Sequence, residues 1–366
     1  MNAFKAGLVV ASAAALLAAC GGGPPTEGGG AAGEPNAKTA DYSQWLELTG
    51  KERHDVLVTA AEKEGKLSLY TSLSAEVVDE LADAWEETYE DIDLEIYRAS
   101  GEEVLPRILQ ENAAGYGGAD VVETNATEME VLGNKGLLQP YQGDALQRVP
   151  AEGKFGTWTA TRFNVFAPSW NTDIVKQGDE PKTWEDLADP AYKGKLALEI
   201  DDYDWYMGLH DYWRAEGKSE EEIDKLFQAM AANAKKVKGH SVMAEMTSSG
   251  QFGVAASNYT YIVEELKADG APIELEPLVS PVILRPNGAG LMKTAQHPAA
   301  ALLFKDWLLD DGQQVLQELN MTPSTDLEGD LGGTDHVMLD VEKVVAENEK
   351  WSKGYEQLLS GSAGTN

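Results

Sequence analysis

Short strand-like runs alternate with helical segments along the first half of this chain, and this alternation most constrains the fold. The segments KLSLYTSLS, DLEIYRAS and ADVVET have the length and apolar pattern of strands. The segments that follow the first two, AEVVDELADAWEETY and GEEVLPRILQENAAG, carry apolar residues at helical spacing. Strands that alternate with helices form layered structures with a mostly parallel sheet. The sequence therefore predicts the α/β class.

Two stretches that lack any helix signal interrupt the alternation, at about 158–171 and 277–292. They bracket one complete α/β unit inside another, which predicts two lobes joined by a two-strand hinge. The chain beyond its N-terminal segment is also longer than one compact core usually holds. The predicted N-terminal lobe comprises 46–158 completed by 282–322, and the predicted C-terminal lobe comprises 159–281 completed by 323–362.

The N-terminus reads MNAFKAGLVVASAAALLAACGGG, with an apolar run too short to span a bilayer. This predicts a signal peptide over residues 1–19. The run ends in Leu-Ala-Ala-Cys, which resembles a bacterial lipobox, and Cys20 is the only cysteine. We expect lipidation of Cys20; a secreted protein without an anchor is the alternative. Residues 20–45 are rich in Gly, Pro and Ala and predict a flexible tether. The expected location is the cell envelope, on the periplasmic or extracellular face of the cytoplasmic membrane.

Charge and motifs restrict the function. The formal net charge of −33 disfavours nucleic acid as a partner and favours cations near the surface, although adaptation to a saline habitat also explains it. With one cysteine the chain has no partner for a disulfide and no thiolate metal site. It contains no H-E-x-x-H, G-x-S-x-G or P-loop motif, and GHSVM lacks the final Gly. These absences disfavour the corresponding enzyme classes; the family resemblance described next makes a protein without enzyme activity the leading expectation.

Four segments resemble a known family: EKEGKLSLYTSLS, ADVVETNATEMEVLGNKGLLQPY, PKTWEDLADPAYKGKLAL and AQHPAAALLFKDWLL. Together they are similar to the extracellular solute-binding proteins of bacterial ABC importers, in the branch that includes ferric-iron-binding proteins. The resemblance implies a periplasmic-binding-protein type II fold. It also implies a small-molecule or metal ligand and an ABC transporter permease as partner. A monomer is expected.

Ligands of open α/β sheets bind beyond the carboxyl ends of the strands, so the loops there predict the site. The predicted N-terminal-lobe residues are Thr71, Ser72, Ser74, Ser100, Gly101, Glu102, Thr124 and Asn125. The predicted C-terminal-lobe residues are Asp202, Tyr203, Asp204, Tyr206, Asn258 and Tyr259. The segment EIDDYDWYMG is notable because carboxylates and aromatic rings are concentrated in it. Its plain alternative is a helix start that favours acidic residues.

Ferric iron is one candidate for the transported ligand, and no cofactor is expected. Iron prefers oxygen ligands, which makes Tyr259, Tyr203 and Asp204 the predicted metal ligands. By the resemblance, iron-binding relatives carry two adjacent tyrosines where this chain reads SNYTY. Tyr259 takes the first position, Thr260 takes the second, and Tyr261 is displaced by one. The His that some relatives contribute after the first strand is also missing from YTSLS.

Three alternatives stay open at this point. Carboxylates interleaved with Trp and Tyr suit an organic cation, such as a polyamine or a thiamine-like amine. Hydroxyl groups and helix starts after TSLS and RASGEE suit an anion. Arg98 is one of few basic residues expected near the cleft, which counts against an anion. Paired carboxylates with cleft aromatics also describe a secreted glycoside hydrolase.

Overall fold

The structure is a computed structural model that describes residues 39–361, except the side chains of residues 328 and 330. The predicted signal peptide, Cys20 and most of the predicted tether lie outside these residues. Within the described part, twelve strands form one mixed sheet in the order β2-β1-β3-β10-β5-β8-β6-β7, with four short strands beside this path. Of these short strands, β4 and β12 pair with β10, whereas β9 and β11 pair with β5.

Parallel strands followed by helices build the first half of the sheet. β1 is flanked by β2 and β3, with Leu67 opposite Leu94 and Leu69 opposite Val121. α2 buries Val77, Leu81 and Trp85 on one face, as its helical spacing predicts. The elements are α1 (Gly50–Glu64), β1 (Lys66–Thr71), α2 (Ala75–Thr88), β2 (Asp93–Arg98), α3 (Gly101–Ala113), β3 (Val121–Asn125), α4 (Ala126–Asn134), β4 (Leu138–Gln139) and the 3-10 helices η1 (Asp144–Arg148) and η2 (Ala151–Gly153).

A second parallel unit follows along the chain, in which β6 lies between β7 and β8. Its elements are η3 (Trp184–Ala188), η4 (Pro190–Tyr192), β6 (Leu196–Glu199), α5 (Tyr203–Ala215), α6 (Glu220–Asn233), β7 (Ala234–Val237), α7 (His240–Ser248), β8 (Val254–Tyr259), α8 (Thr260–Ala268) and β9 (Ile273–Glu274). The remaining elements are α9 (Pro298–Leu308), α10 (Asp311–Glu318), β11 (Thr322–Pro323), α11 (Leu327–Asp330), β12 (His336–Met338), α12 (Val341–Ala346) and α13 (Asn348–Ser360). α13 packs against α5 and α6.

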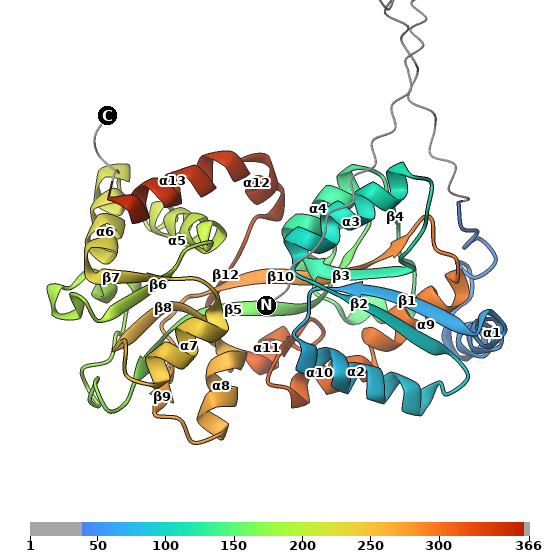
Figure 1. Ribbon diagram of the computed structural model, residues 1–366, viewed down its shortest axis with the longest axis horizontal. Helices are drawn as coiled ribbons and strands as arrows, with labels where there is room; N and C mark the ends of the chain where they lie inside the picture. Colours follow the sequence, from blue (N-terminus) through green and yellow to red (C-terminus); the bar gives the residue numbers. More distant parts are fainter. Residues whose placement is uncertain (1–38, 362–366) are drawn as a thin grey trace, which may run out of the picture. The chain divides into compact units, whose positions relative to one another are not determined.

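Two long antiparallel strands, β5 (Thr159–Asn171) and β10 (Val282–Met292), connect the halves (Figure 1). β10 pairs with β3 on one side and β5 pairs with β8 on the other, so both strands belong to both halves. The register between them shifts after Asn287. Gly288 permits the close approach there, because a Cβ atom on it would lie 2.5 Å from the carbonyl oxygen of Thr159. These strands form the predicted two-strand connection.

Each half has its own hydrophobic core. The first is built around Trp85, Phe304 and Trp307, and the second around Trp205 and Trp213. The partly buried Tyr261 packs against both clusters. Two cores joined through a continuous sheet confirm the predicted two-lobed α/β fold.

The predicted tether ends too late along the chain. Tyr42 and Trp45 are buried, and the Tyr42 hydroxyl donates to the carbonyl oxygen of Met292 (2.8 Å). The Trp45 carbonyl oxygen accepts a hydrogen bond from Arg53 (2.9 Å). The packed body therefore includes residues that the prediction assigned to the tether, because these aromatic side chains find apolar surface in the first core. Among residues 39–361, no helix has the length and apolar character needed to cross a bilayer.

Candidate ligand-binding site

The carboxyl ends of β1, β2 and β3 meet at one edge of the sheet. The register places Thr71 opposite Arg98 on β2 and opposite Glu123 on β3. α2, α3 and α4 begin within four residues of these strand ends, so their unpaired N–H groups gather at the same edge. A Cβ atom on Gly101 would lie 2.9 Å from Asn125 Nδ2 and 3.0 Å from Thr124 Oγ1. Glycine at this position therefore lets the starts of α3 and α4 approach each other.

Hydroxyl groups and one buried ion pair line this first wall. Thr124 Oγ1 donates to Ser72 Oγ (2.9 Å), and Thr71 Oγ1 donates to Glu123 Oε2 (2.8 Å). The other carboxylate oxygen of Glu123 lies 3.5 Å from Arg162 Nε, and both side chains are almost fully buried. Burial raises the pKa of Glu123, and the charge of Arg162 opposes this rise. Arg162 comes from the connecting strand β5, so the first wall reaches the middle of the sheet.

Asp202 organises the second wall, directly before α5. Its Oδ2 accepts a hydrogen bond from Ser257 (2.5 Å), and its Oδ1 lies 3.1 Å from His240 Nε2. The His240 ring packs on the Tyr259 ring with 3.8 Å between centroids. Glu199, Asp202 and His240 place one ligand-type atom each within 4.8 Å of one another. Burial and the nearby charge of Asp202 raise the pKa of Glu199.

Arg285 of β10 lies between the walls and binds two of the predicted site residues. Its guanidinium donates to Asp204 Oδ2 (3.1 Å) and to the hydroxyl of Tyr259. The side chains of Asp204 and Arg285 are 5% and 16% exposed, so this ion pair is largely removed from water. Burial lowers the pKa of Arg285, but its electrostatic interactions with Tyr259, Asp204 and Asp202 outweigh burial and raise it overall. Burial also raises the pKa of Tyr259 well above its usual value, so this side chain is a neutral phenol.

The two walls contact each other. Tyr203 of α5 lies within hydrogen-bonding reach of Thr127 of α4, and its hydroxyl also accepts a hydrogen bond from Asn348 Nδ2 (2.7 Å). Burial raises the pKa of Glu128 of α4, and the charge of Arg285 opposes this. Tyr261 stacks at 5.9 Å on Tyr259. Side chains of the two halves thus meet around Arg285.

Buried polar atoms without a hydrogen-bond partner gather at this meeting point. Such atoms are rare in folded proteins, because each costs free energy unless water or a ligand satisfies it. Within residues 39–361, eleven buried side-chain atoms lack a partner, and seven of them belong to residues of the two walls or the connecting strands. They are Glu123 Oε1, Glu128 Oε2, Arg162 Nε, His240 Nδ1, Asn258 Oδ1, Arg285 Nε and Asn287 Oδ1. This concentration marks the candidate site.

Most of the residues predicted from sequence lie on the walls. The structure brings together Thr71, Ser72, Gly101, Thr124 and Asn125 on the first wall, and Asp202, Asp204 and Tyr259 on the second, with Tyr203 between them. Asn258 is buried on β8 and its Nδ2 donates to Ser169 Oγ of β5 (2.7 Å). Ser74 caps α2 by accepting from the backbone N–H of Val77 (3.4 Å). Ser100 and Glu102 are exposed at the start of α3. Their roles in ligand binding stay predictions.

The sequence-based prediction that Tyr206 contributes to the ligand site is wrong. Its ring packs against Phe227, Trp351 and Tyr355, with centroids 4.4, 5.6 and 5.4 Å away, on the side of α5 that faces α6 and α13. Two positions along a helix turn a side chain by about 200°. Asp204 and Tyr206 therefore point in nearly opposite directions, which the sequence pattern alone did not separate.

The expectation of few basic residues near the cleft is also wrong, because Arg162 and Arg285 both lie in the site. Arg98, the residue expected there, is exposed and donates to the carbonyl oxygen of Leu73 (2.8 Å). The sequence did contain a pattern that could have identified these two arginines as buried site residues. Each missed arginine is an isolated charge inside an otherwise apolar strand pattern, and a buried charge requires a partner. His240 carries no comparable signal, because its partner Asp202 is distant in sequence.

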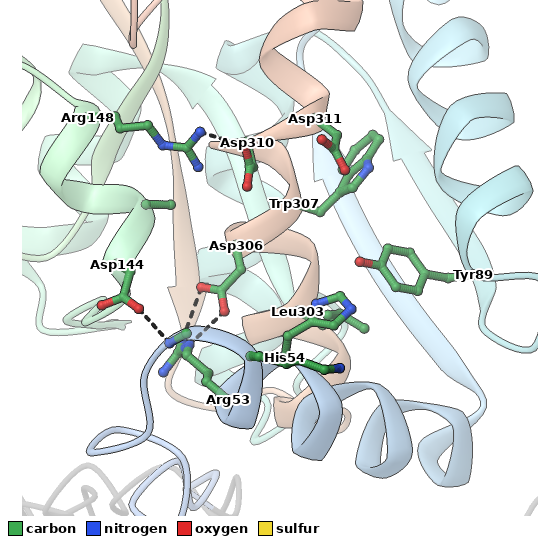
Figure 2. A pocket seen from close by; sticks show the side chains of 13 residues that line it. Arg53, His54, Tyr89, Asp144, Arg148, Leu303, Asp306, Trp307, Asp310 and Asp311 are labelled. Carbon is green, nitrogen blue, oxygen red and sulfur yellow. Dashed lines mark hydrogen bonds and ion pairs between the residues drawn. The ribbon is translucent and has the colours of Figure 1, made fainter.

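A hollow elsewhere on the first half has a different character (Figure 2). It measures about 450 Å³ and is lined by Asp306 and Asp310, whose carboxylates already pair with Arg53 (2.7 Å) and Arg148 (2.5 Å). These two carboxylates therefore have partners within the protein. None of the seven unpartnered atoms of the two walls and connecting strands belongs to a residue that lines this hollow.

Two lobes with separate cores, two connecting strands, and a polar site where their strand ends meet define a two-lobed solute-binding protein. The comparisons agree. Residues 71–315 match the family of bacterial extracellular solute-binding proteins. The chain belongs to this family and is a solute-binding protein, not an enzyme. This excludes the glycoside hydrolase alternative.

Individual relatives refine the comparison. The chain is 28% identical over 275 residues to iron uptake protein A2 of Synechocystis sp., which covers 69% of this chain and 76% of that protein. Among solved structures it resembles Trichodesmium IdiA (FutA) in complex with iron and citrate, with TM-score 0.64, 19% identity, and coverage of 82% and 99% of the two chains. It also resembles the periplasmic binding protein AfuA from Actinobacillus pleuropneumoniae with fructose 6-phosphate bound, with TM-score 0.67, 21% identity, and coverage of 81% and 99%.

Proposed function

We propose that this protein captures a small solute between its lobes and delivers it to an ABC transporter permease, while a lipid on Cys20 holds it at the outer face of the cytoplasmic membrane. The observation that carries the capture step is the concentration of unpartnered buried atoms between the walls. A solute that satisfied them would recover the free energy that their burial costs. The connecting strands would bend as the lobes close on it.

Ferric iron is a candidate ligand, supported by the names of the iron-related relatives. The three predicted metal ligands already have hydrogen-bond partners within the protein, which counts against ferric iron. Tyr259 and Asp204 already bind Arg285, and the hydroxyl of Tyr203 is bound by Asn348. A ferric ion between Tyr259 and Asp204 would have to replace the guanidinium as their partner. An organic cation faces the same requirement.

The proposal is tested on the ligand that co-purifies with the full chain. The protein is denatured, and the released material is analysed by mass spectrometry and by metal analysis. We expect one small solute or metal at near-stoichiometric amount, and we expect its return to raise the melting temperature, since a ligand that binds only the folded state stabilises it. A chain that releases nothing, and that no solute from the same extract stabilises, would contradict solute capture.

The anchoring step has its own test. In the producing bacterium, Cys20→Ser should move the protein from the membrane fraction to the soluble envelope or culture fraction, because the sulfur that carries the lipid is gone. Its solute binding should not change. A variant that stays in the membrane fraction would contradict lipidation at Cys20.

A further inference from the structure

We propose that Arg285 supplies, as part of the protein, the positive charge that a metal ion would otherwise bring to the site, so that the captured solute is a metal-free oxyanion. This inference rests on the proposed solute-binding function and names its ligand class. It concerns small organic carboxylates or phosphates, whose shared chemistry is a negatively charged oxygen group.

The position of Arg285 is the first support. The guanidinium contacts Asp204 and Tyr259, two of the three metal ligands predicted from the sequence. An arginine is always protonated, and its planar fork suits carboxylate and phosphate groups. Its Nε is buried and has no hydrogen-bond partner. One donor of this cation is therefore left for a ligand.

The first wall is the second support, because it offers donors of hydrogen bonds. Arg162 is 5% exposed, and its Nε lacks a hydrogen bond although the oxygen of Glu123 lies 3.5 Å away. Ser72 and Thr124 add hydroxyl groups beside the starts of α3 and α4, where N–H groups and the helix dipole favour negative charge. An oxyanion between the walls would satisfy donors from both connecting strands.

The charges of the carboxylates around the site are the third support. Asp204 is paired with Arg285, and Glu123 lies beside Arg162. Asp202 accepts a hydrogen bond from Ser257, and its other oxygen lies 3.1 Å from His240 Nε2. Glu128 and Glu199 are further carboxyl groups at the site, and burial raises the pKa of both. Glu128 Oε2 is buried and has no hydrogen-bond partner. An added cation at Asp204 or Glu123 would meet a carboxylate that already has an arginine partner.

The experiment uses the full chain after removal of metal with a chelator. Citrate, fructose 6-phosphate and inorganic phosphate are titrated by calorimetry without metal, and ferric nitrilotriacetate is added in a separate series with its visible spectrum recorded. We expect saturable binding of at least one free anion. The citrate and phosphate-bearing series distinguish a carboxylate from a phosphate ligand. We expect iron to give no intense visible band, since Tyr259 stays a neutral phenol bound by Arg285.

Variants separate Arg285 from general damage. The double variant Arg285→Gln with Asp204→Asn removes both charges, so that no unpaired charge is left buried. It should bind the anion about 30-fold or more weakly, because hydrogen bonds from a charged donor usually contribute that much to affinity. Arg285→Lys keeps the charge but not the fork and should retain part of the affinity. The control is the double variant Arg148→Gln with Asp310→Asn, an exposed ion pair on the first half that should bind like the wild type.

Three results would overturn the inference: an iron-dependent visible band in the wild type without binding of free anions, unchanged anion affinity in the Arg285 double variant, or no response to any of the three anions. The test of the ligand class is separate from the test of the proposed solute-binding function. If a metal or an amine co-purifies and stabilises the protein while the anions do not bind, solute capture stands and the oxyanion assignment is wrong.

Discussion

Replacing Asp204 with Asn should destabilise the fold strongly, because it leaves the charge of Arg285 buried without its carboxylate. The two groups lie 3.1 Å apart, and their side chains are 5% and 16% exposed. Removing one partner of a buried ion pair typically costs about 3–5 kcal/mol. Since Tyr259 still accepts from the guanidinium, we expect the lower end, about 3 kcal/mol in the free energy of unfolding.

Asp310→Asn is the matched control. It makes the same chemical change in an ion pair with Arg148, whose side chains are 55% and 48% exposed. Exposed pairs contribute about 0–1 kcal/mol, because water replaces the lost partner. The difference between the two variants therefore isolates the effect of burial.

Urea unfolding followed by tryptophan fluorescence measures both variants, and the nine Trp residues provide signals in both lobes. With an m-value of about 3 kcal/mol/M, the midpoint of the Asp204 variant should fall by about 1 M urea. If the lobes unfold in separate transitions, each is fitted by itself. Equal midpoints for the Asp204 and Asp310 variants would refute the reasoning. So would a double variant Asp204→Asn with Arg285→Met that is no more stable than Asp204→Asn alone, because removing the second charge should recover stability.

Three further predictions concern the site and its support. Tyr259→Phe should weaken solute binding about tenfold without preventing folding, because Arg285 loses a charged hydrogen bond; calorimetry with the co-purified ligand measures this, and unchanged affinity would remove the hydroxyl from the site. Gly101→Ala should weaken binding because its Cβ would press on Asn125 Nδ2 at 2.9 Å, whereas Gly354→Ala, with its nearest neighbouring atom at 4.0 Å, should bind normally. Burial lowers the pKa of Lys305 from 10.5 to about 7, so the folded state binds fewer protons than the unfolded state between these values. The free energy of unfolding should then rise with pH across this window, and Lys305→Met should flatten the rise measured by urea unfolding at pH 7 and pH 9; an equal slope in both proteins would contradict this.

The alternation of strands and helices was readable because it depends on residues that are neighbours in sequence. Apolar spacing predicted β1, α2 and β3 to within a few residues, and the helix-free stretches predicted β5 and β10. The buried Tyr42 was not predicted, because the Gly- and Pro-rich composition around it is local and its partner Met292 is far along the chain.

The site was predicted only in part for the same reason. Strand ends gave the positions of Thr124, Asp204 and Tyr259, since the carboxyl edge of a sheet follows from strand order. The direction of Tyr206 depended on which face of α5 the second core covers, and that face is fixed by contacts with α6 and α13.

By itself, the sequence determined the class of fold, the two connecting strands and the family, because local periodicity and short motifs are properties of consecutive residues. Only the tertiary structure decided what occupies the centre of the site. Arg285 is 81 residues from Asp204 and 26 from Tyr259 along the chain. Sheet register brings the three together, and in a desolvated site their mutual charges decide which ligand can enter.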